Sequence, residues 1–203
     1  MFIQPIYKYA CIGAMIAFAT FCEADVVVEI SALGSDTMVS VTGSLEFEGL
    51  TPSNSTTHAS RLNLNPGFSG LVSAGVGAAG YTVDLTPFGT APTGSIAISD
   101  PGFWVAYIDP QSTSAEQIFM SSGYVSGTNM NSSLMLSGHS LSDLNLSVGD
   151  NWGVSFPIYD STGSPTSTSQ SLTFRAVQAV PEPSPFMLLG LLAVFAGLRK
   201  RLT

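Results

Sequence analysis

The chain has 203 residues, of which 45% are hydrophobic and only 10% are charged, and its formal net charge is −8. Soluble domains average about 25% charged residues, and a nucleic-acid-binding protein needs a basic surface. The composition therefore argues against a nucleic-acid partner and excludes a basic helix lying on a membrane. Residues 25–180 hold twelve acidic and two basic residues, a net charge of −10, so most of the basic charge lies at the two ends.

Residues 1–24 have the pattern of a secretory signal peptide. Lys8 supplies the positive charge, and the apolar run from Ala10 to Phe21 is shorter than a spanning helix of about 20 residues. Small residues follow this run, and we predict cleavage after Ala24. The strand-like segment Val26-Val27-Val28 would then lie near the new N-terminus.

The choice of cleavage site decides the thiol chemistry of the mature protein. Cys11 and Cys22 are the two cysteines of the chain, so cleavage after Ala24 leaves neither a disulfide nor a thiol. Two alternatives stay open. Cleavage after Ala19 would retain Cys22 as a lone thiol, and lipidation at Cys22 would make the protein a lipoprotein.

Residues 25–179 form the predicted ectodomain. No long stretch has apolar residues at helical spacing, whereas many short stretches alternate between apolar and polar residues, which is typical of strands. Eight stretches alternate in this way. Their apolar residues are Val39, Val41, Leu45 and Phe47, with a bend at Gly43; Leu62 and Leu64; Tyr81, Val83 and Leu85; Ile96 and Ile98; Leu134 and Leu136; Leu144, Leu146 and Val148; Trp152, Val154, Phe156 and Ile158; and Leu172, Phe174 and Ala176.

Several details of this domain follow from single features. The run 103–108 is apolar at successive positions, which predicts a central strand, whereas Pro157 predicts an edge strand. We expect a polar loop over 160–171 and one helical turn near 115–117. The fold class predicted is all-β, an antiparallel β-sandwich of jelly-roll type, flanked by an N-terminal signal helix and a C-terminal membrane helix.

Motifs for catalysis or cofactor binding are weak in this chain. The segment 75–80 matches G-x-G-x-x-G, but a strand-like stretch follows it where a dinucleotide site needs a helix. His58 and His139 have no partners at zinc-ligand spacing. Glu46 and Glu48 are most simply a solvated face of one strand. We therefore predict no metal, no cofactor and no enzymatic activity, although a weak calcium site among the Asp-bearing turns and a serine-histidine-acid arrangement stay open.

Aromatic side chains are the remaining candidates for ligand contact, because sugars stack on exposed aromatic rings. Trp152 shares its parity with Val154 and Phe156, which favours a place in the core. Trp104 and Tyr107 lie on opposite faces of one predicted strand, so they cannot form a single platform. The candidates for glycan contact are Trp104, Tyr107, Tyr124, Trp152 and Tyr159.

The C-terminal segment, residues 180–203, has three parts in a fixed order. The motif Val180-Pro181-Glu182-Pro183-Ser184 comes first, an apolar stretch over 186–198 follows, and the basic cluster Arg199-Lys200-Arg201 ends it. The apolar stretch is about 20 Å long as a helix, against a bilayer core of about 30 Å. The basic cluster would snorkel and hold its end in the cytoplasm. A plain C-terminal anchor helix is the alternative.

This three-part end resembles the PEP-CTERM sorting signal of bacteria. The resemblance implies that an exosortase, a membrane cysteine transpeptidase, is a partner that cuts near the motif and releases or re-anchors the ectodomain. It also implies export in a Gram-negative-type bacterium that makes exopolysaccharide, with transient anchoring in the inner membrane through residues 186–198. The short apolar stretch departs from the family's pattern. Neither end would then belong to the fold.

A second resemblance covers parts of the ectodomain. Some PEP-CTERM ectodomains carry a Gly-Ser-Leu and Gly-Leu segment early, a Ser-Gly-Tyr-Val-Ser-Gly segment later and a Leu-x-Leu-x-x-Gly turn before a Trp strand. The matching positions are Gly43-Ser44-Leu45 with Gly49-Leu50, 122–127, Leu144 to Gly149, and Trp152. This similarity implies the β fold and no activity.

These features predict a non-enzymatic exported protein of the cell surface or extracellular matrix, processed by an exosortase and associated with exopolysaccharide. The few charges and many hydroxyls suit a hydrated glycan matrix. The alternative is a carbohydrate-binding module that recognises a specific glycan by aromatic stacking. A secreted hydrolase is the third class, and it would need two carboxyls about 5–10 Å apart in a cleft or a histidine near a serine and an acid.

Overall fold

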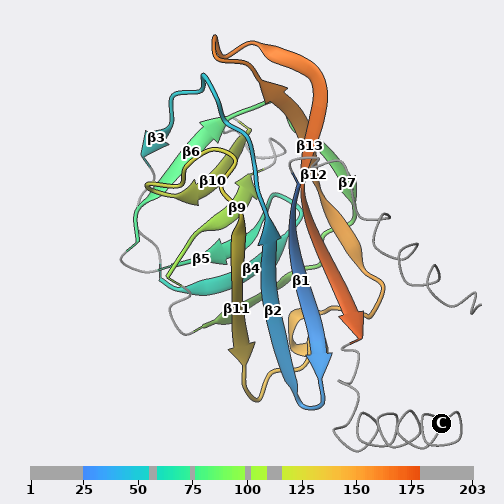
Figure 1. Ribbon diagram of the computed structural model, residues 1–203. Coiled ribbons are helices and arrows are strands. Elements are labelled where there is room, and N and C mark those ends of the chain that lie inside the picture. Colours follow the sequence, from blue (N-terminus) through green and yellow to red (C-terminus); the bar gives the residue numbers. More distant parts are fainter. Residues whose placement is uncertain (1–24, 55–58, 74–75, 99–101, 109–115, 179–203) are drawn as a thin grey trace, which may run out of the picture.

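The computed structural model describes residues 25–54, 59–73, 76–98, 102–108 and 116–178 (Figure 1). In these residues the chain forms two β-sheets and one short 3-10 helix, which confirms the predicted all-β class. The predicted signal helix and membrane helix lie outside the described residues. No helix within the described residues has the length and apolarity that crossing a membrane requires.

The first sheet has six strands in the order β11-β2-β1-β13-β12-β7. The first and last strands of the described chain, β1 and β13, lie side by side in parallel (Figure 1), whereas the other neighbours are antiparallel. The strands are β1 (Asp25–Leu33), β2 (Asp36–Gly43), β7 (Thr86–Gly89), β11 (Met130–Leu136), β12 (Asn151–Tyr159) and β13 (Pro165–Gln178).

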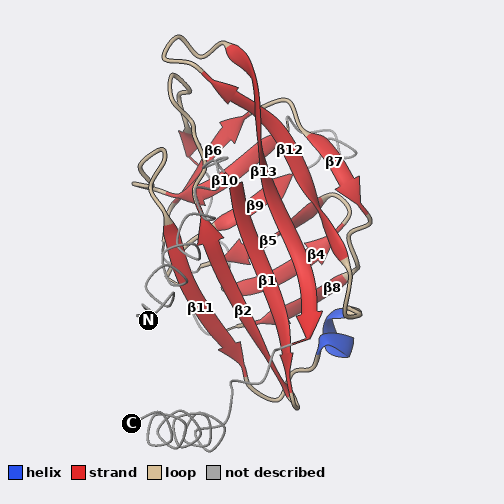
Figure 2. Ribbon diagram, turned by 45° about the vertical axis from the view of Figure 1, so that its right-hand side comes forward, coloured by secondary structure: helices blue, strands red, loops and turns tan. Residues whose placement is uncertain are grey.

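The second sheet has seven antiparallel strands in the order β3-β6-β10-β9-β5-β4-β8. Its strands run across those of the first sheet (Figure 2). The central place of β9 confirms the prediction made for residues 103–108. The strands are β3 (Ser53–Asn54), β4 (Arg61–Asn65), β5 (Phe68–Val72), β6 (Ala78–Thr82), β8 (Gly94–Ala97), β9 (Val105–Ile108) and β10 (Gln117–Ser121).

The main hydrophobic core lies between the two sheets. In β1 the residues Val26, Val28 and Ile30 are fully buried, as the period of two in a strand requires. Rings from both sheets meet in this core: Tyr107 of β9 lies edge-on to Phe174 of β13, with ring centroids 6.0 Å apart. The two layers therefore share one core.

A second, smaller cluster covers the outer side of the seven-stranded sheet. Trp104 is its largest member and lies against Phe119, with ring centroids 6.4 Å apart. The Trp104 indole N–H donates to the carbonyls of Ser73 (3.1 Å) and Val76 (2.9 Å). Both faces of this sheet are thus covered by side chains, which explains why its central strand is apolar at successive positions.

The strand order differs from the jelly roll, which has eight strands in two Greek keys. Consecutive strands pair directly as β1 with β2, β4 with β5, β9 with β10, and β12 with β13. Direct hairpins arise because only short connections separate these strands. The prediction of two layers with mainly antiparallel strands is confirmed. The strand order differs from that of the predicted jelly roll.

Two predicted segments have other structures. Leu144, Leu146 and Val148 do not form a strand, because Leu141–Leu144 is a 3-10 helix, η2. Its start is capped by Ser140, whose backbone N–H donates to the Asp143 carboxylate at 2.7 Å. The end of the G-x-G-x-x-G match belongs to strand β6, so it opens no helix and fits no dinucleotide.

The predicted loop and helical turn also need correction. Strand β13 begins at Pro165, well inside the expected polar loop over 160–171. Its first five residues are all exposed, so this part of the strand has no apolar alternation by which the sequence could reveal it. Gln117 begins strand β10 and is not part of a helical turn, whereas 109–115 lie outside the described residues. The bend at Gly43 is confirmed: β2 ends there with φ at +109°. Leu45 and Phe47 are buried beyond it, but they lie outside any strand.

Pro157 was predicted to mark an edge strand, which is correct for one half of β12. β7 pairs with β12 only from Trp152 to Ser155, whereas β13 pairs with it as far as Tyr159. Pro157 therefore lies where β12 has a single neighbour, and its missing N–H breaks no ladder. In its first half β12 is an interior strand.

Candidate functional site

Four of the five aromatic candidates for glycan contact are buried. Trp104 is 2% exposed, Tyr107 3%, Trp152 0% and Tyr159 7%. A ring enclosed on both faces offers no surface on which a sugar can stack, so these four positions do not support the predicted contact. The prediction that Trp152 belongs to the core is confirmed, since it stacks on Phe174 at 5.6 Å.

Tyr124 is half-buried, and its hydroxyl is already engaged. It accepts a hydrogen bond from the Leu45 N–H at 2.9 Å and lies 2.9 Å from the Thr128 carbonyl, to which it donates. The pKa of Tyr124 is raised, chiefly because burial disfavours the phenolate. Tyr124 therefore fastens the segment after β2 to the loop that precedes β11.

These hydrogen bonds join two of the segments on which the ectodomain resemblance is based, the one that begins at Gly43 and 122–127. The Phe47 N–H donates to the Ser126 hydroxyl at 2.8 Å, and that hydroxyl donates to the Glu46 carboxylate at 2.8 Å. Gly127 lies so close that a Cβ there would be 2.6 Å from a Glu46 carboxylate oxygen. The contacts give these residues a structural role.

Among the described residues, the acidic and histidine candidates do not assemble into a reactive site. Glu46 is held by Ser126, whereas Glu48 is exposed in the turn that follows, so they are not a pair on one strand face. His139 lies in the turn after β11, and His58 lies outside the described residues. Within the described part of the chain, no three His, Cys, Asp or Glu side chains come together as metal ligands.

The aspartates at turns bind their own loops. The Asp160 carboxylate accepts hydrogen bonds from the Thr162 hydroxyl (2.6 Å), the Thr162 N–H (2.8 Å) and the Ser164 N–H (3.1 Å). These donors lower the pKa of Asp160. Asp143 is similar, with its pKa lowered by the backbone N–H and hydroxyl of Ser140. Both carboxylates therefore stabilise the turns in which they lie.

The solvent face of the six-stranded sheet is the most distinctive surface. Residues that alternate with the core positions of β11, β2, β1, β13 and β12 share this face, and the pairing registers align them in rows. About half carry a hydroxyl or an amide, among them Asn131, Ser133, Ser40, Thr42, Ser171, Thr173 and Ser155, whereas Val27, Met38, Met135 and Val177 are apolar. We call this surface the hydroxyl face.

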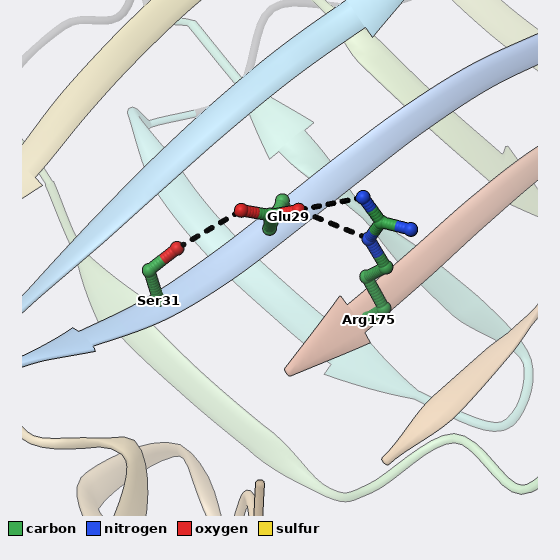
Figure 3. Close-up of polar contacts among 3 residues, drawn as sticks. All are labelled: Glu29, Ser31 and Arg175. Atoms are coloured by element: carbon green, nitrogen blue, oxygen red, sulfur yellow. Dashed lines mark hydrogen bonds and ion pairs between the residues drawn. The ribbon is translucent and has the colours of Figure 1, made fainter. Parts of the chain in front are cut away.

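Charged residues are few on the hydroxyl face. Arg175 of β13 and Glu29 of β1 lie opposite each other, and the guanidinium donates to one carboxylate oxygen through Nε (3.0 Å) and Nη2 (2.7 Å). Ser31 donates to the other oxygen at 3.3 Å (Figure 3). Among the described residues of these five strands, Asp25 and Asp36 are the further charges on this face. The face therefore carries a small negative charge, contributed by these two aspartates.

A shallow polar hollow of about 500 Å³ lies at the end of the hydroxyl face where β1 begins. Ser171 donates to the Asp25 carboxylate through its N–H (2.6 Å) and its hydroxyl (2.7 Å). The hollow thus offers one carboxylate and several hydroxyls, which are groups that hydrogen-bond to sugar hydroxyls. Its lining residues are Asp25, Ser155, Ser167, Thr168, Ser169, Gln170 and Ser171.

A second hollow, of about 310 Å³, lies between strand β11 and the ends of β9 and β10. Phe103, Tyr124 and Met130 give it an apolar wall, and Ser122 and Ser132 lie at its rim. We call it the β11 groove. It has no acidic or basic lining residue in the part of the chain described.

The remaining predicted site residues lie outside the described residues. These are the cleavage position Ala24, the motif Val180 to Ser184 and the cluster Arg199 to Arg201. Sequence patterns also missed groups that the structure brings together. Gln170 and Phe103 gave no signal, because one lies in a hydroxyl-rich run and the other in an apolar one.

In the comparisons with known proteins, no family model, no curated protein and no solved structure matches this chain.

Proposed function

We propose that the chain is a non-enzymatic exported protein that is sorted through its C-terminal segment by an exosortase. It is displayed at the cell surface or retained in the extracellular matrix, where its antiparallel β-sandwich contacts exopolysaccharide. The sorting part of the proposal rests on residues 180–203, whose motif, apolar stretch and basic cluster follow one another in order. The predicted signal peptide at 1–24 supports export.

The hydroxyl face carries the glycan part of the proposal. Five neighbouring strands present hydroxyl and amide groups there, with one internally neutralised ion pair. Neighbouring strands are about 4.8 Å apart, so the polar groups of two adjacent rows, Asn131-Thr42-Val27-Thr173 and Ser133-Ser40-Glu29-Arg175, form a hydrogen-bonding surface. Such a surface suits many weak contacts along a hydrated polysaccharide, and it does not depend on aromatic stacking. The burial of four aromatic candidates favours this mode over a stacking module.

Glycan contact is tested with the full chain bound to exopolysaccharide extracted from the producing bacterium. The test variant combines Ser40→Ala, Thr42→Val and Ser133→Ala, which removes three neighbouring hydroxyls from the face. The control combines Thr51→Val, Thr82→Val and Ser95→Ala, which removes three exposed hydroxyls elsewhere. We expect the test variant to bind about tenfold more weakly and the control to bind like the wild type. Equal binding by both would refute the role of this face.

Sorting is tested separately, in the producing bacterium. Replacing Pro181, Glu182 and Pro183 by alanine should leave the unprocessed chain in the membrane fraction, whereas the wild-type ectodomain reaches the surface or medium. The control replaces Pro165, which is exposed at the start of β13, by alanine. Normal processing of the motif variant would refute exosortase sorting and favour the plain anchor.

A further inference from the structure

The four edge strands of the two sheets differ greatly in length. In the described residues β3 has two residues, while β7 and β8 have four each. Strand β11 has seven, Met130–Leu136, and all seven pair with β2 in one continuous register. An edge strand exposes a row of unpaired N–H and C=O groups, which invites another strand to pair with it.

Strand β11 lacks the usual features that block such pairing. Native edges are protected by charged side chains, proline, bulges or shortness. The sequence of β11 is Met-Asn-Ser-Ser-Leu-Met-Leu, with no charge and no proline, and its register shows no bulge. By contrast, β7 is short and contains Pro87. Met135 of β11 is also 42% exposed.

The β11 groove is a second, independent observation at this edge. It is lined by Met130, Asn131 and Ser132, which are consecutive residues of β11, and by Phe103 and Tyr124 on the other side. A strand added beside β11 would therefore have an apolar hollow next to it for one of its side chains. Ser132 and the half-buried Leu134 lie on the groove side, since Asn131, Ser133 and Met135 share the opposite face.

We propose that β11 pairs with β11 of a second copy of this chain, in antiparallel orientation about Ser133. The pairing joins the two six-stranded sheets into one continuous sheet of twelve strands. Ser133 lies opposite its own counterpart, Ser132 lies opposite Leu134 of the second copy, and Leu134 lies opposite the second copy's Ser132. Because Ser132 lines the β11 groove, this register places each Leu134 side chain beside the β11 groove of the other copy.

The β11 edge adds no local charge repulsion between two copies of this chain. Residues 25–180 carry a net charge of −10, so two copies repel each other over most approach directions. The antiparallel β11 pair brings no charged side chain opposite another. The same twofold geometry closes after two copies, because each β11 has one free edge, and it therefore gives a dimer and not a filament.

A crosslinking experiment tests the geometry in the full chain. Cys11 and Cys22 are replaced by alanine, so that an introduced cysteine is the only thiol. Ser133→Cys places two thiols across the twofold axis, with Cβ atoms about 5 Å apart. The matched control is Ser40→Cys, which lies in the same row on β2. Its two thiols would be about 14 Å apart, three strand spacings.

We expect a short thiol-to-thiol crosslinker to link the Ser133→Cys chains into dimers at least tenfold faster than the Ser40→Cys chains. Equal rates, or a linkage of Ser133→Cys to a different protein, would overturn the proposal. A second measurement uses charge. Ser133→Lys alone and Ser133→Glu alone should be monomeric, because like charges face each other, whereas a mixture of the two should form mixed dimers.

Ser40→Lys is the control for an effect of the added charge on folding. It places the same charge on β2, one strand away from the edge, and should leave the dimer intact. Wild-type chain that remains monomeric at all concentrations in a sedimentation experiment would overturn the proposal. So would a Ser133→Lys variant that dimerises as well as the wild type. The proposal is independent of the glycan role, since it uses the edge of the sheet and not its face.

Discussion

The side chain of Gln170 forms two hydrogen bonds with the backbone of Glu46, 124 residues away. Its carbonyl accepts from the Glu46 N–H at 2.7 Å, and its amide donates to the Glu46 carbonyl at 2.7 Å. Gln170 is 1% exposed. The Gln170 side chain thus supplies the two hydrogen bonds that a neighbouring strand would give to the Glu46 backbone. Glu46 lies in the segment after β2, which belongs to no strand.

Replacing Gln170 by leucine should destabilise the protein by about 1 to 3 kcal/mol. The change keeps the volume but leaves the Glu46 N–H and C=O without partners. The free energy of unfolding, measured in urea, checks the effect. Ser169→Ala, one residue away and exposed, should change it by less than about 0.5 kcal/mol. A Gln170→Leu protein as stable as the wild type would show that water replaces both bonds.

Tyr124→Phe should cost about 1 to 2 kcal/mol of stability. The substitution removes the hydroxyl that accepts from Leu45 and donates to Thr128, while the ring keeps its edge-on contact with Phe47. Tyr159→Phe is the matched comparison, because within the described residues its hydroxyl has one hydrogen bond, from the Asp84 N–H at 3.2 Å. The smaller loss should belong to Tyr159→Phe, and the reverse order would contradict the fastening role of Tyr124.

Gly70→Ala should destabilise the chain by about 3 kcal/mol or more. A Cβ at Gly70 would lie 2.2 Å from the Ala106 Cβ, which faces it on the neighbouring strand β9. Thermal unfolding measures the loss, and adding Ala106→Gly should recover part of it. Gly34→Ala meets no atom within 4 Å and has only its positive φ of +66° to strain it, so it should cost about 1 kcal/mol. No recovery in the double variant would refute the steric cause.

Asp160 should make the stability depend on acid pH. Its hydrogen bonds hold its folded pKa below the ordinary value of 3.8, so the unfolded chain binds the proton more tightly. Its stabilising effect is therefore fully present above the unfolded pKa and is lost as the pH falls through the folded pKa. Urea midpoints measured from pH 5 to pH 2 should fall less steeply in Asp160→Asn than in the wild type. Parallel slopes would contradict this role, and Ser161→Ala serves as a control.

The sequence patterns predicted the class of the fold because strands leave a local signature, the alternation of apolar and polar residues. Trp152 was placed in the core from its parity with Val154 and Phe156, and the structure confirms it. The same alternation misled at Leu144 and Leu146, because Leu144 ends a 3-10 helix and Leu146 is buried just after its left-handed cap, Asn145. Local spacing does not distinguish these two cases.

The surface features were beyond local patterns. Trp104 was a candidate for an exposed ring, yet it is buried because a second cluster covers the outer side of its sheet. Gln170 lies in a hydroxyl-rich run, and only the distant Glu46 backbone explains its burial. The hydroxyl face itself arises from registers between β11, β2, β1 and β13, which alternation within one strand does not specify.

The parallel pairing of β1 with β13 bears on the order in which the chain acquires its fold. β13 lies between β1 and β12, so the six-stranded sheet stays in two parts until the last described strand arrives. Contacts that join residues about 146 positions apart, such as Glu29 with Arg175, form late because a long loop must close first. In a chain exported from its N-terminus, the domain would therefore complete its fold only once residues up to Gln178 have emerged, immediately before the segment proposed for sorting. The folded domain could then form only after its translocation is complete. If an exosortase acts after this point, its substrate would be a folded domain and not an unfolded chain.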